Sequence, residues 1–191
     1  AHLCRSDDGG TSFTVLPGPS LPERGFDEHM VLERGDGALV MAVRTHYGIG
    51  RTISTDGGVT WKPPAAGHHV YRVGPGTRFH LRRLPSGRVL LIYHESCRVR
   101  SHLTAYLSED DGETFPWALL LDQRESVSYP DAAISAGGKI WIVYDRERTG
   151  AMEILLASIT EEDIQSGRVD DSTSFAKRVI TSPRSAQPGR P

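Results

Sequence analysis

Residues 28–61 read EHMVLERGDGALVMAVRTHYGIGRTISTDGGVTW, and this stretch holds the pattern on which the fold prediction rests. An acid, Glu28, opens it, and a Gly-Asp-Gly turn at 35–37 separates two apolar runs. Arg44 ends the second run, and an aspartate–glycine turn closes the stretch on Trp61. The rest of the chain repeats this order of features at a regular interval.

The closing turn belongs to a repeated octapeptide, Ser-x-Asp-x-Gly-x-(Ser/Thr)-aromatic, at residues 6–13, 54–61 and 108–115. The first serines lie 48 and then 54 residues apart. The aspartate can accept hydrogen bonds from amides of its own turn, and glycine supplies the positive φ of a tight turn. We expect the aromatic residue to pack under the turn. Ser158 follows in the same phase, but the residues after it lack the glycines.

A second repeated pattern, a glycine before an apolar run, predicts the strands. Gly37, Gly87 and Gly138 each precede a short apolar run rich in β-formers, at 38–43, 89–93 and 140–144. Such runs are typical of buried strands. Further strand candidates occupy 47–53, 102–107 and 153–157. Each unit thus reads as four antiparallel strands, which at this period indicates an all-β fold, the β-propeller, with one blade per unit.

The predicted domain covers residues 1–181 and holds about three and a half blades, because the chain opens inside a blade. One short helix is expected from Thr160 to Gln165, capped by Thr160 and Asp163. The tail, residues 182–191, is expected to be disordered. Trp117 and Trp141 are expected in blade cores.

Composition excludes several classes of function. The 22 basic and 24 acidic residues nearly cancel, so nucleic acid is not a predicted partner. No run is long enough to span a membrane and no signal peptide is recognised, so the compartment stays open. Cys4 and Cys97 have no metal spacing, and the pair His68-His69 lacks a third ligand. We therefore predict no metal and no cofactor.

The repeat also aligns polar residues at two positions. Glu28, Arg78 and Tyr129 stand nine residues before the hairpin glycines. Seven residues after the same glycines stand Arg44, His94 and Asp145. Equivalent positions of successive blades are related by rotation about the propeller axis, so Glu28, Arg78 and Tyr129 are expected to converge at one mouth of the channel. The alternative is that these are strand-end polar residues facing water.

A glutamate beside a tyrosine has a specific chemistry. A phenol has a pKa near 10 and becomes a good nucleophile at neutral pH only when a base removes its proton. A tyrosine avoids anion–anion repulsion when the substrate carries a carboxylate at the reacting carbon. Sialidases are the glycosidases known for a tyrosine nucleophile, where most others use a carboxylate. Nearby arginines would hold the substrate carboxylate through paired hydrogen bonds.

At this point the sequence resembles the bacterial exo-sialidase (neuraminidase) family, six-bladed propellers whose octapeptide repeats are called Asp boxes. Glu28, Glu33, Asp36-Gly37, Arg44 and the Asp box at 54–61 follow the family order. Arg100 lies before the Asp box at 108–115, and the Ser128-Tyr129-Pro130-Asp131 segment follows it. Arg98 competes with Arg100 for the same place.

The resemblance implies roles for these residues. Tyr129 would be the nucleophile, Glu28 its base, and Arg44 and Arg100 two members of an arginine triad that binds the substrate carboxylate. Arg78 is an additional pocket candidate. The family's first triad arginine and its aspartate acid/base have no matching segment here, so we expect the chain alone to be catalytically incompetent.

Three functions follow as alternatives. The first is a retaining exo-sialidase acting on sialylated glycans. The second is a hydrolase or lyase of another acidic sugar, and the third is a non-catalytic propeller that binds glycans or proteins. His94 is either a sugar contact or structural. Residues 144–148 are expected to form an ion-pair cluster, with Asp145 or Arg146 at the mouth of the channel as the lesser alternative.

Overall fold

The computed structural model describes residues 2–62 and 70–183. The expectations for His68, for His69 and for residues 184–191 of the tail lie outside these ranges. The chain divides into two compact units, Ala1–Gly76 and Thr77–Pro191, and each is described by itself.

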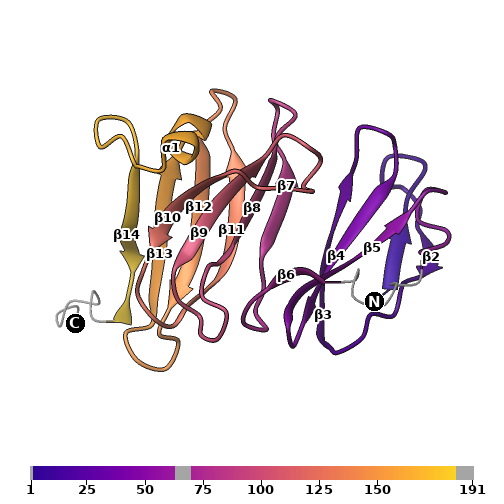
Figure 1. Ribbon diagram of the computed structural model, residues 1–191, viewed down its shortest axis with the longest axis horizontal. Coiled ribbons are helices and arrows are strands. Elements are labelled where there is room, and N and C mark those ends of the chain that lie inside the picture. Colours follow the sequence, from indigo (N-terminus) through magenta and orange to yellow (C-terminus); the bar gives the residue numbers. More distant parts are fainter. Residues whose placement is uncertain (1, 63–69, 184–191) are drawn as a thin grey trace, which may run out of the picture. The chain divides into compact units, whose positions relative to one another are not determined.

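The first unit contains a two-stranded and a four-stranded antiparallel sheet (Figure 1). In the smaller sheet, β1 pairs with β2. The larger sheet has the order β3-β4-β5-β6, so each strand pairs with its neighbour in sequence. The strands are β1 His2–Arg5, β2 Thr14–Pro17, β3 Arg24–Glu33, β4 Leu39–Thr45, β5 Gly48–Ser54 and β6 Val70–Val73.

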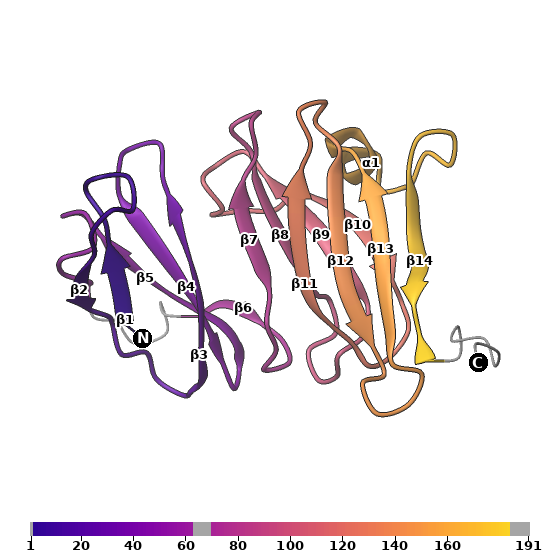
Figure 2. The ribbon, with the colours of Figure 1, turned by 180° about the vertical axis from the view of Figure 1, so that it is seen from behind.

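The second unit contains two four-stranded antiparallel sheets and a short helix, α1 (Figure 2). One sheet has the order β7-β8-β9-β10 and the other β11-β12-β13-β14. The elements are β7 His80–Arg83, β8 Val89–His94, β9 Leu103–Ser108, β10 Trp117–Asp122, β11 Val127–Ile134, β12 Ile140–Arg146, β13 Glu153–Ile159, α1 Glu161–Ser166 and β14 Phe175–Thr181. The predicted four-stranded units are confirmed in all three repeats.

The hairpin between the first two strands of each sheet has the same hydrogen bonds in all three repeats. Gly37 donates to the carbonyl of Arg34 at 3.0 Å, and Gly87 and Gly138 make the matching bonds at 2.9 Å. All three glycines have positive φ, between 79° and 90°. The left-handed conformation is the reason that glycine recurs at this position.

The Asp boxes form closed turns whose hydrogen bonds are internal. In the box at 54–61, Asp56 accepts from the Thr60 amide at 2.9 Å, and Ser54 Oγ accepts from the Gly58 amide at 2.9 Å. Hydrogen bonds from Thr60 lower the pKa of Asp56 to about 2, although the carboxylate is exposed. The aromatic residue is half-buried in two boxes, whereas Phe13 is 64% exposed and its ring lies close to Gly10 of its own turn.

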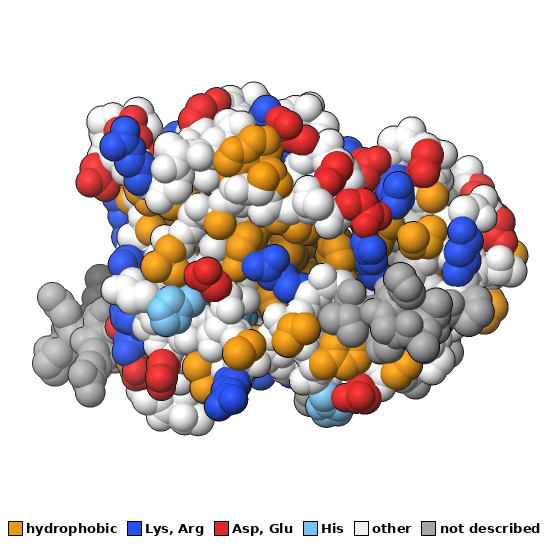
Figure 3. Space-filling view, viewed as in Figure 1, with side chains coloured by type: hydrophobic (Ala, Val, Ile, Leu, Met, Phe, Trp, Pro, Cys, Tyr) orange, Lys and Arg blue, Asp and Glu red, His pale blue; other side chains and the backbone are white. Residues whose placement is uncertain are grey.

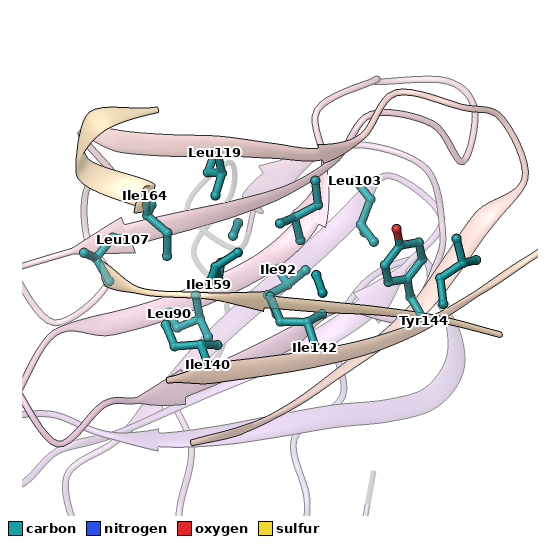
Figure 4. Close-up of a cluster of buried hydrophobic side chains, with 14 of the residues drawn as sticks. Leu90, Ile92, Leu103, Leu107, Leu119, Ile140, Ile142, Tyr144, Ile159 and Ile164 are labelled. Carbon is teal, nitrogen blue, oxygen red and sulfur yellow. The ribbon is translucent and has the colours of Figure 1, made fainter. Parts of the chain in front are cut away.

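A continuous apolar core fills the second unit (Figure 4). Leu90 and Ile92 of β8 face Ile140 and Ile142 of β12. Ile164 places α1 against the same core. Thr160 and Asp163 cap the helix as predicted, through reciprocal side chain–backbone hydrogen bonds.

The third apolar run differs from the first two. Strand β8 is buried on both faces, whereas β12 alternates between buried and exposed residues. Trp141 is 40% exposed, so its expected core position is wrong. Its ring makes an edge contact with Phe175 of β14, with 6.1 Å between ring centroids. Within the described residues, one face of this sheet therefore remains open and apolar.

Candidate functional site

Glu28 and Tyr129 occupy equivalent irregularities in the first strands of their sheets. The β3–β4 register shifts between Arg24 and His29, and the β11–β12 register shifts between Ser128 and Asp131. A bulge redirects side chains and is frequent beside active sites. Positions 28 and 129 therefore share a backbone irregularity, while the convergence of Glu28, Arg78 and Tyr129 stays a prediction.

The backbone around Tyr129 is strained. Tyr129 has φ 54°, in the left-handed region that bulky residues rarely adopt. Ser126 and Glu147 also have positive φ, and the Glu147 amide donates to the Ser126 carbonyl at 3.0 Å. Strained residues cluster at functional sites, where the surrounding structure holds them in place. This cluster identifies the start of β11 and the end of β12 as the candidate site of the second unit.

A pocket of about 490 Å³ opens at the same place. Its lining includes the strained Ser126 and Glu147, together with Arg100, Ser128 and Arg148. The carbonyl of Arg100 accepts from the amide of Val127 at 3.2 Å, which ties the Arg100 loop to the start of β11. The pocket lining thus combines guanidinium and hydroxyl groups with the Glu147 carboxylate, and the Arg100 guanidinium is the group suited to an anionic ligand.

Beside the pocket, Ser128, Asp145 and Arg148 form a closed triangle of polar contacts. Ser128 and Asp145 are paired across β11 and β12, and the Ser128 hydroxyl donates to Asp145 Oδ1 at 2.6 Å. Arg148 donates to Asp145 Oδ2 at 2.5 Å and lies 3.2 Å from the Ser128 hydroxyl. The guanidinium carbon of Arg148 lies 4.0 Å from the centroid of the Tyr129 ring. The expected ion-pair cluster at 144–148 is confirmed.

His94 is fully buried beneath this site. Its Nε2 lies 2.8 Å from the carbonyl oxygen of Val127, and because a carbonyl only accepts, Nε2 carries the proton. Burial lowers the pKa of His94 to about 4, against the hydrogen bond to Val127 and with help from the charge of Arg100. His94 is therefore a neutral residue that anchors the start of β11.

Glu28 and Arg44 contact each other in the first unit. Arg44 Nη1 donates to Glu28 Oε2 at 2.8 Å, and its Nε and Nη2 donate to the Gly76 carbonyl at 3.0 and 2.7 Å. Arg44 is 4% exposed, so it is not a strand-end residue facing water. A side chain on Gly76 would meet the Thr45 carbonyl at 3.0 Å, and this close approach explains the glycine.

The remaining candidates lie nearby in the second unit. Arg78 is half-buried two residues before β7, and Arg98 is exposed in the loop that carries Arg100. Strands β7 and β11 lie side by side (Figure 2), and His80 Nδ1 contacts Asp131 at 2.9 Å. Burial lowers the pKa of His80, although Asp131 opposes the shift.

Two contacts were not predicted from the sequence. Arg148 was expected only as a member of an ion-pair cluster, not on the ring of Tyr129. Tyr144 donates to the buried Asp122 at 3.1 Å, and burial raises the pKa of Tyr144. A tyrosine that is harder to ionise is a poor nucleophile, so Tyr129 remains the better candidate of the two.

Acidic and basic side chains are interspersed on the face shown in Figure 3. Across residues 2–62 and 70–183, no group of three or more His, Cys, Asp or Glu side chains is arranged to hold a metal ion. In the same described part of the chain, no helix has the length and apolar character needed to cross a membrane.

The sequence and the repeated blades together define a BNR-repeat protein. The BNR repeat-like domain family matches residues 1–142, and the chain belongs to this family. No curated protein matches the sequence.

Solved sialidases share the fold. The Hadza microbial sialidase Hz136 is 21% identical with a TM-score of 0.68, over 83% of this chain and 32% of its own. The NanB sialidase from Streptococcus pneumoniae, solved with 2-[(3-chlorobenzyl)ammonio]ethanesulfonate, is 18% identical with a TM-score of 0.52. The match covers 93% of this chain and 28% of that one. The chain thus spans about a third of each sialidase, and the fold is a sialidase-like β-propeller.

Proposed function

We propose that this chain carries part of the active site of a retaining glycosidase that removes terminal sialic acid, or a related acidic sugar, from glycans. The observation that carries the proposal is the strained Tyr129, which lies in a bulge of β11 beside a pocket that contains Arg100. The sialidase fold of the relatives supports it.

In the proposed reaction, Glu28 accepts the phenolic proton of Tyr129. The phenolate oxygen attacks the anomeric carbon, and the bond to the leaving-group oxygen breaks as a carboxylic acid protonates that oxygen. Water then cleaves the glycosyl–tyrosine bond, and the phenol is regenerated. Arg44 and Arg100 bind the carboxylate of the sugar through charge-assisted hydrogen bonds. Arg78 is a further contact for the substrate.

Substituting the proposed nucleophile tests the reaction. Tyr129→Phe keeps the ring and removes the hydroxyl, so release of a fluorophore from a sialoside reporter should fall about a thousandfold or more. The assay uses a polypeptide that contains these 191 residues and releases the fluorophore, because the 191-residue chain alone is expected to be inactive. Tyr144→Phe, which removes a buried hydroxyl outside the pocket, is the control and should retain turnover in any sample that folds. Unchanged turnover in Tyr129→Phe would contradict the assignment of Tyr129 as the nucleophile.

A second candidate function is glycan binding without turnover. The observation in its favour is the ion pair between Arg44 and Glu28, which engages the carboxylate that the hydrolytic reaction needs as its base. Glu28→Gln separates the two functions. In a hydrolase it should lower turnover, whereas in a binding protein it should leave glycan affinity unchanged and no sialoside or uronic acid substrate should be cleaved.

A further inference from the structure

The end of β12 turns back over the start of β11. Glu147 follows β12 directly and has φ 49°, in the left-handed region. Its carbonyl accepts from the amides of Gly150 at 3.0 Å and Met152 at 2.7 Å, which closes a tight loop. Arg148 is the second residue of this loop, and its side chain contacts Ser128 and Tyr129 of β11.

Two contacts fix the guanidinium of Arg148. Asp145 Oδ2 accepts from its Nε, and Nη2 lies 3.2 Å from the hydroxyl of Ser128. The Asp145 side chain is only 18% exposed, whereas that of Arg148 is 46% exposed. Asp145 is therefore the fixed partner, because the Ser128 hydroxyl also donates to its other oxygen.

The planar group held in this way lies over the Tyr129 ring, with its central carbon 4.0 Å from the ring centroid. A guanidinium can stack on an aromatic face while its edges make hydrogen bonds. Burial would lower the pKa of Arg148, but the hydrogen bond and charge of Asp145 raise it, with a smaller contribution from Tyr129. Arg148 thus remains charged over the ring.

We propose that Asp145 and Arg148 form a positioning arm that holds the ring of Tyr129 in the orientation for nucleophilic attack. The inference rests on the proposed function of Tyr129. Asp145 holds Arg148 in place, and Arg148 covers one face of the Tyr129 ring. The fixed ring then sets the direction of the Tyr129 hydroxyl. Arg148 acts through Tyr129 and is a positioning residue, as distinct from the arginines assigned to the substrate carboxylate.

The geometry is tested first, without any need for turnover. NMR of the 191-residue chain with labelled tyrosine rings and arginine side chains should show nuclear Overhauser contacts between the Tyr129 ring and Arg148. The tyrosine signals that disappear in Tyr129→Phe identify the Tyr129 ring. Asp145→Asn should weaken these contacts severalfold, because the amide no longer binds the guanidinium as an ion pair. Arg178, which lies over the Phe175 ring, provides the matched control, and Arg178→Met should leave the contacts unchanged.

The role is tested by kinetics in a polypeptide that turns over a sialoside. Arg148→Met should lower kcat about tenfold to a hundredfold and change KM less than about twofold, because a misplaced nucleophile slows the chemical step. Arg148→Lys should recover part of kcat, since it restores the charge without the planar stack. Arg178→Met should leave both constants unchanged.

The outcomes separate this inference from the function on which it rests. Absent Tyr129–Arg148 contacts would overturn the arm, whether or not the protein is an enzyme. An increase in KM with unchanged kcat in Arg148→Met would also overturn it, by making Arg148 a substrate ligand. Intact contacts in a longer polypeptide that cleaves neither a sialoside nor another acidic glycoside would refute the proposed function and, with it, the role of the arm in attack.

Discussion

Arg44 donates hydrogen bonds to Glu28 and to the Gly76 carbonyl, both in the first unit. Breaking a buried ion pair leaves an uncompensated charge. Arg44→Met should therefore lower the free energy of unfolding by about 3 kcal/mol, measured by urea denaturation. Arg51→Met is the control, because Arg51 lies over the Tyr71 ring at 5.2 Å and should cost less than about 1 kcal/mol. Equal losses in the two variants would show that the Arg44 contacts are not stabilising.

His94 predicts a dependence of stability on pH. Its pKa is about 4 in the folded chain and about 6.5 when exposed, so between these values the unfolded chain binds more protons. The free energy of unfolding should rise with pH across this window, by up to about 3 kcal/mol, and the gain should be complete above pH ~6.5.

His94→Gln, whose amide can still donate to the Val127 carbonyl, should flatten this dependence, while the exposed His46→Gln should not. Urea denaturation at several pH values measures the slopes. The burial of His80 acts in the same direction and accounts for the slope that remains. A slope that His94→Gln leaves intact would mean that His94 is not the neutral buried group described above.

Among the site residues, the repeat predicted the position of Tyr129 but not its neighbours. The spacing of nine residues before a hairpin glycine is a local relation along the chain. In β3 and in β11 this position coincides with a shift in strand register. The stacking of Arg148 depends on the left-handed turn at Glu147, which nothing in the residue type demands. The contact therefore could not be predicted from sequence spacing.

At the level of elements, the strands and turns were predictable because their causes are local. The hairpin glycines, the apolar runs and the Thr160–Asp163 cap all formed where the sequence placed them. The exposed face of β12 was not predictable, because residues 140–144 are as apolar as 89–93. Whether a strand is covered on both faces depends on the neighbouring sheet, and that is a non-local property.

The Asp boxes allow a test of how burial changes the energy of one turn. Ser108 is fully buried, donates to Asp110 at 2.7 Å and accepts from the Gly112 amide at 2.9 Å. Ser6 makes the same two contacts in an exposed box. Ser108→Ala should lower the free energy of unfolding by about 1–3 kcal/mol, and Ser6→Ala by less than about 0.5 kcal/mol. Thermal or urea unfolding measures the free energy of unfolding of both variants. Equal losses in the two variants would contradict a role for burial.

At the scale of the whole molecule, the chain is a series of BNR-repeat blades, and the residues proposed for hydrolysis belong to two separate units. Glu28 and Arg44 belong to the first unit, and Tyr129 and Arg100 to the second. The sialidases that share the fold are about three times as long as the part that matches. The proposed hydrolysis is therefore a property of a whole sialidase-like polypeptide and not of this chain alone. Its direct signature is a covalent intermediate on one residue.

Mapping that intermediate is the most direct measurement. A 3-fluorosialosyl fluoride should leave a glycosyl group on the nucleophile, because the fluorine beside the anomeric centre slows breakdown of the intermediate. Mass spectrometry of the digested protein should find the added sugar on Tyr129, and on no peptide of Tyr129→Phe. A polypeptide that hydrolyses sialosides but carries the sugar on another residue, or carries none, would contradict the assignment of Tyr129 as nucleophile.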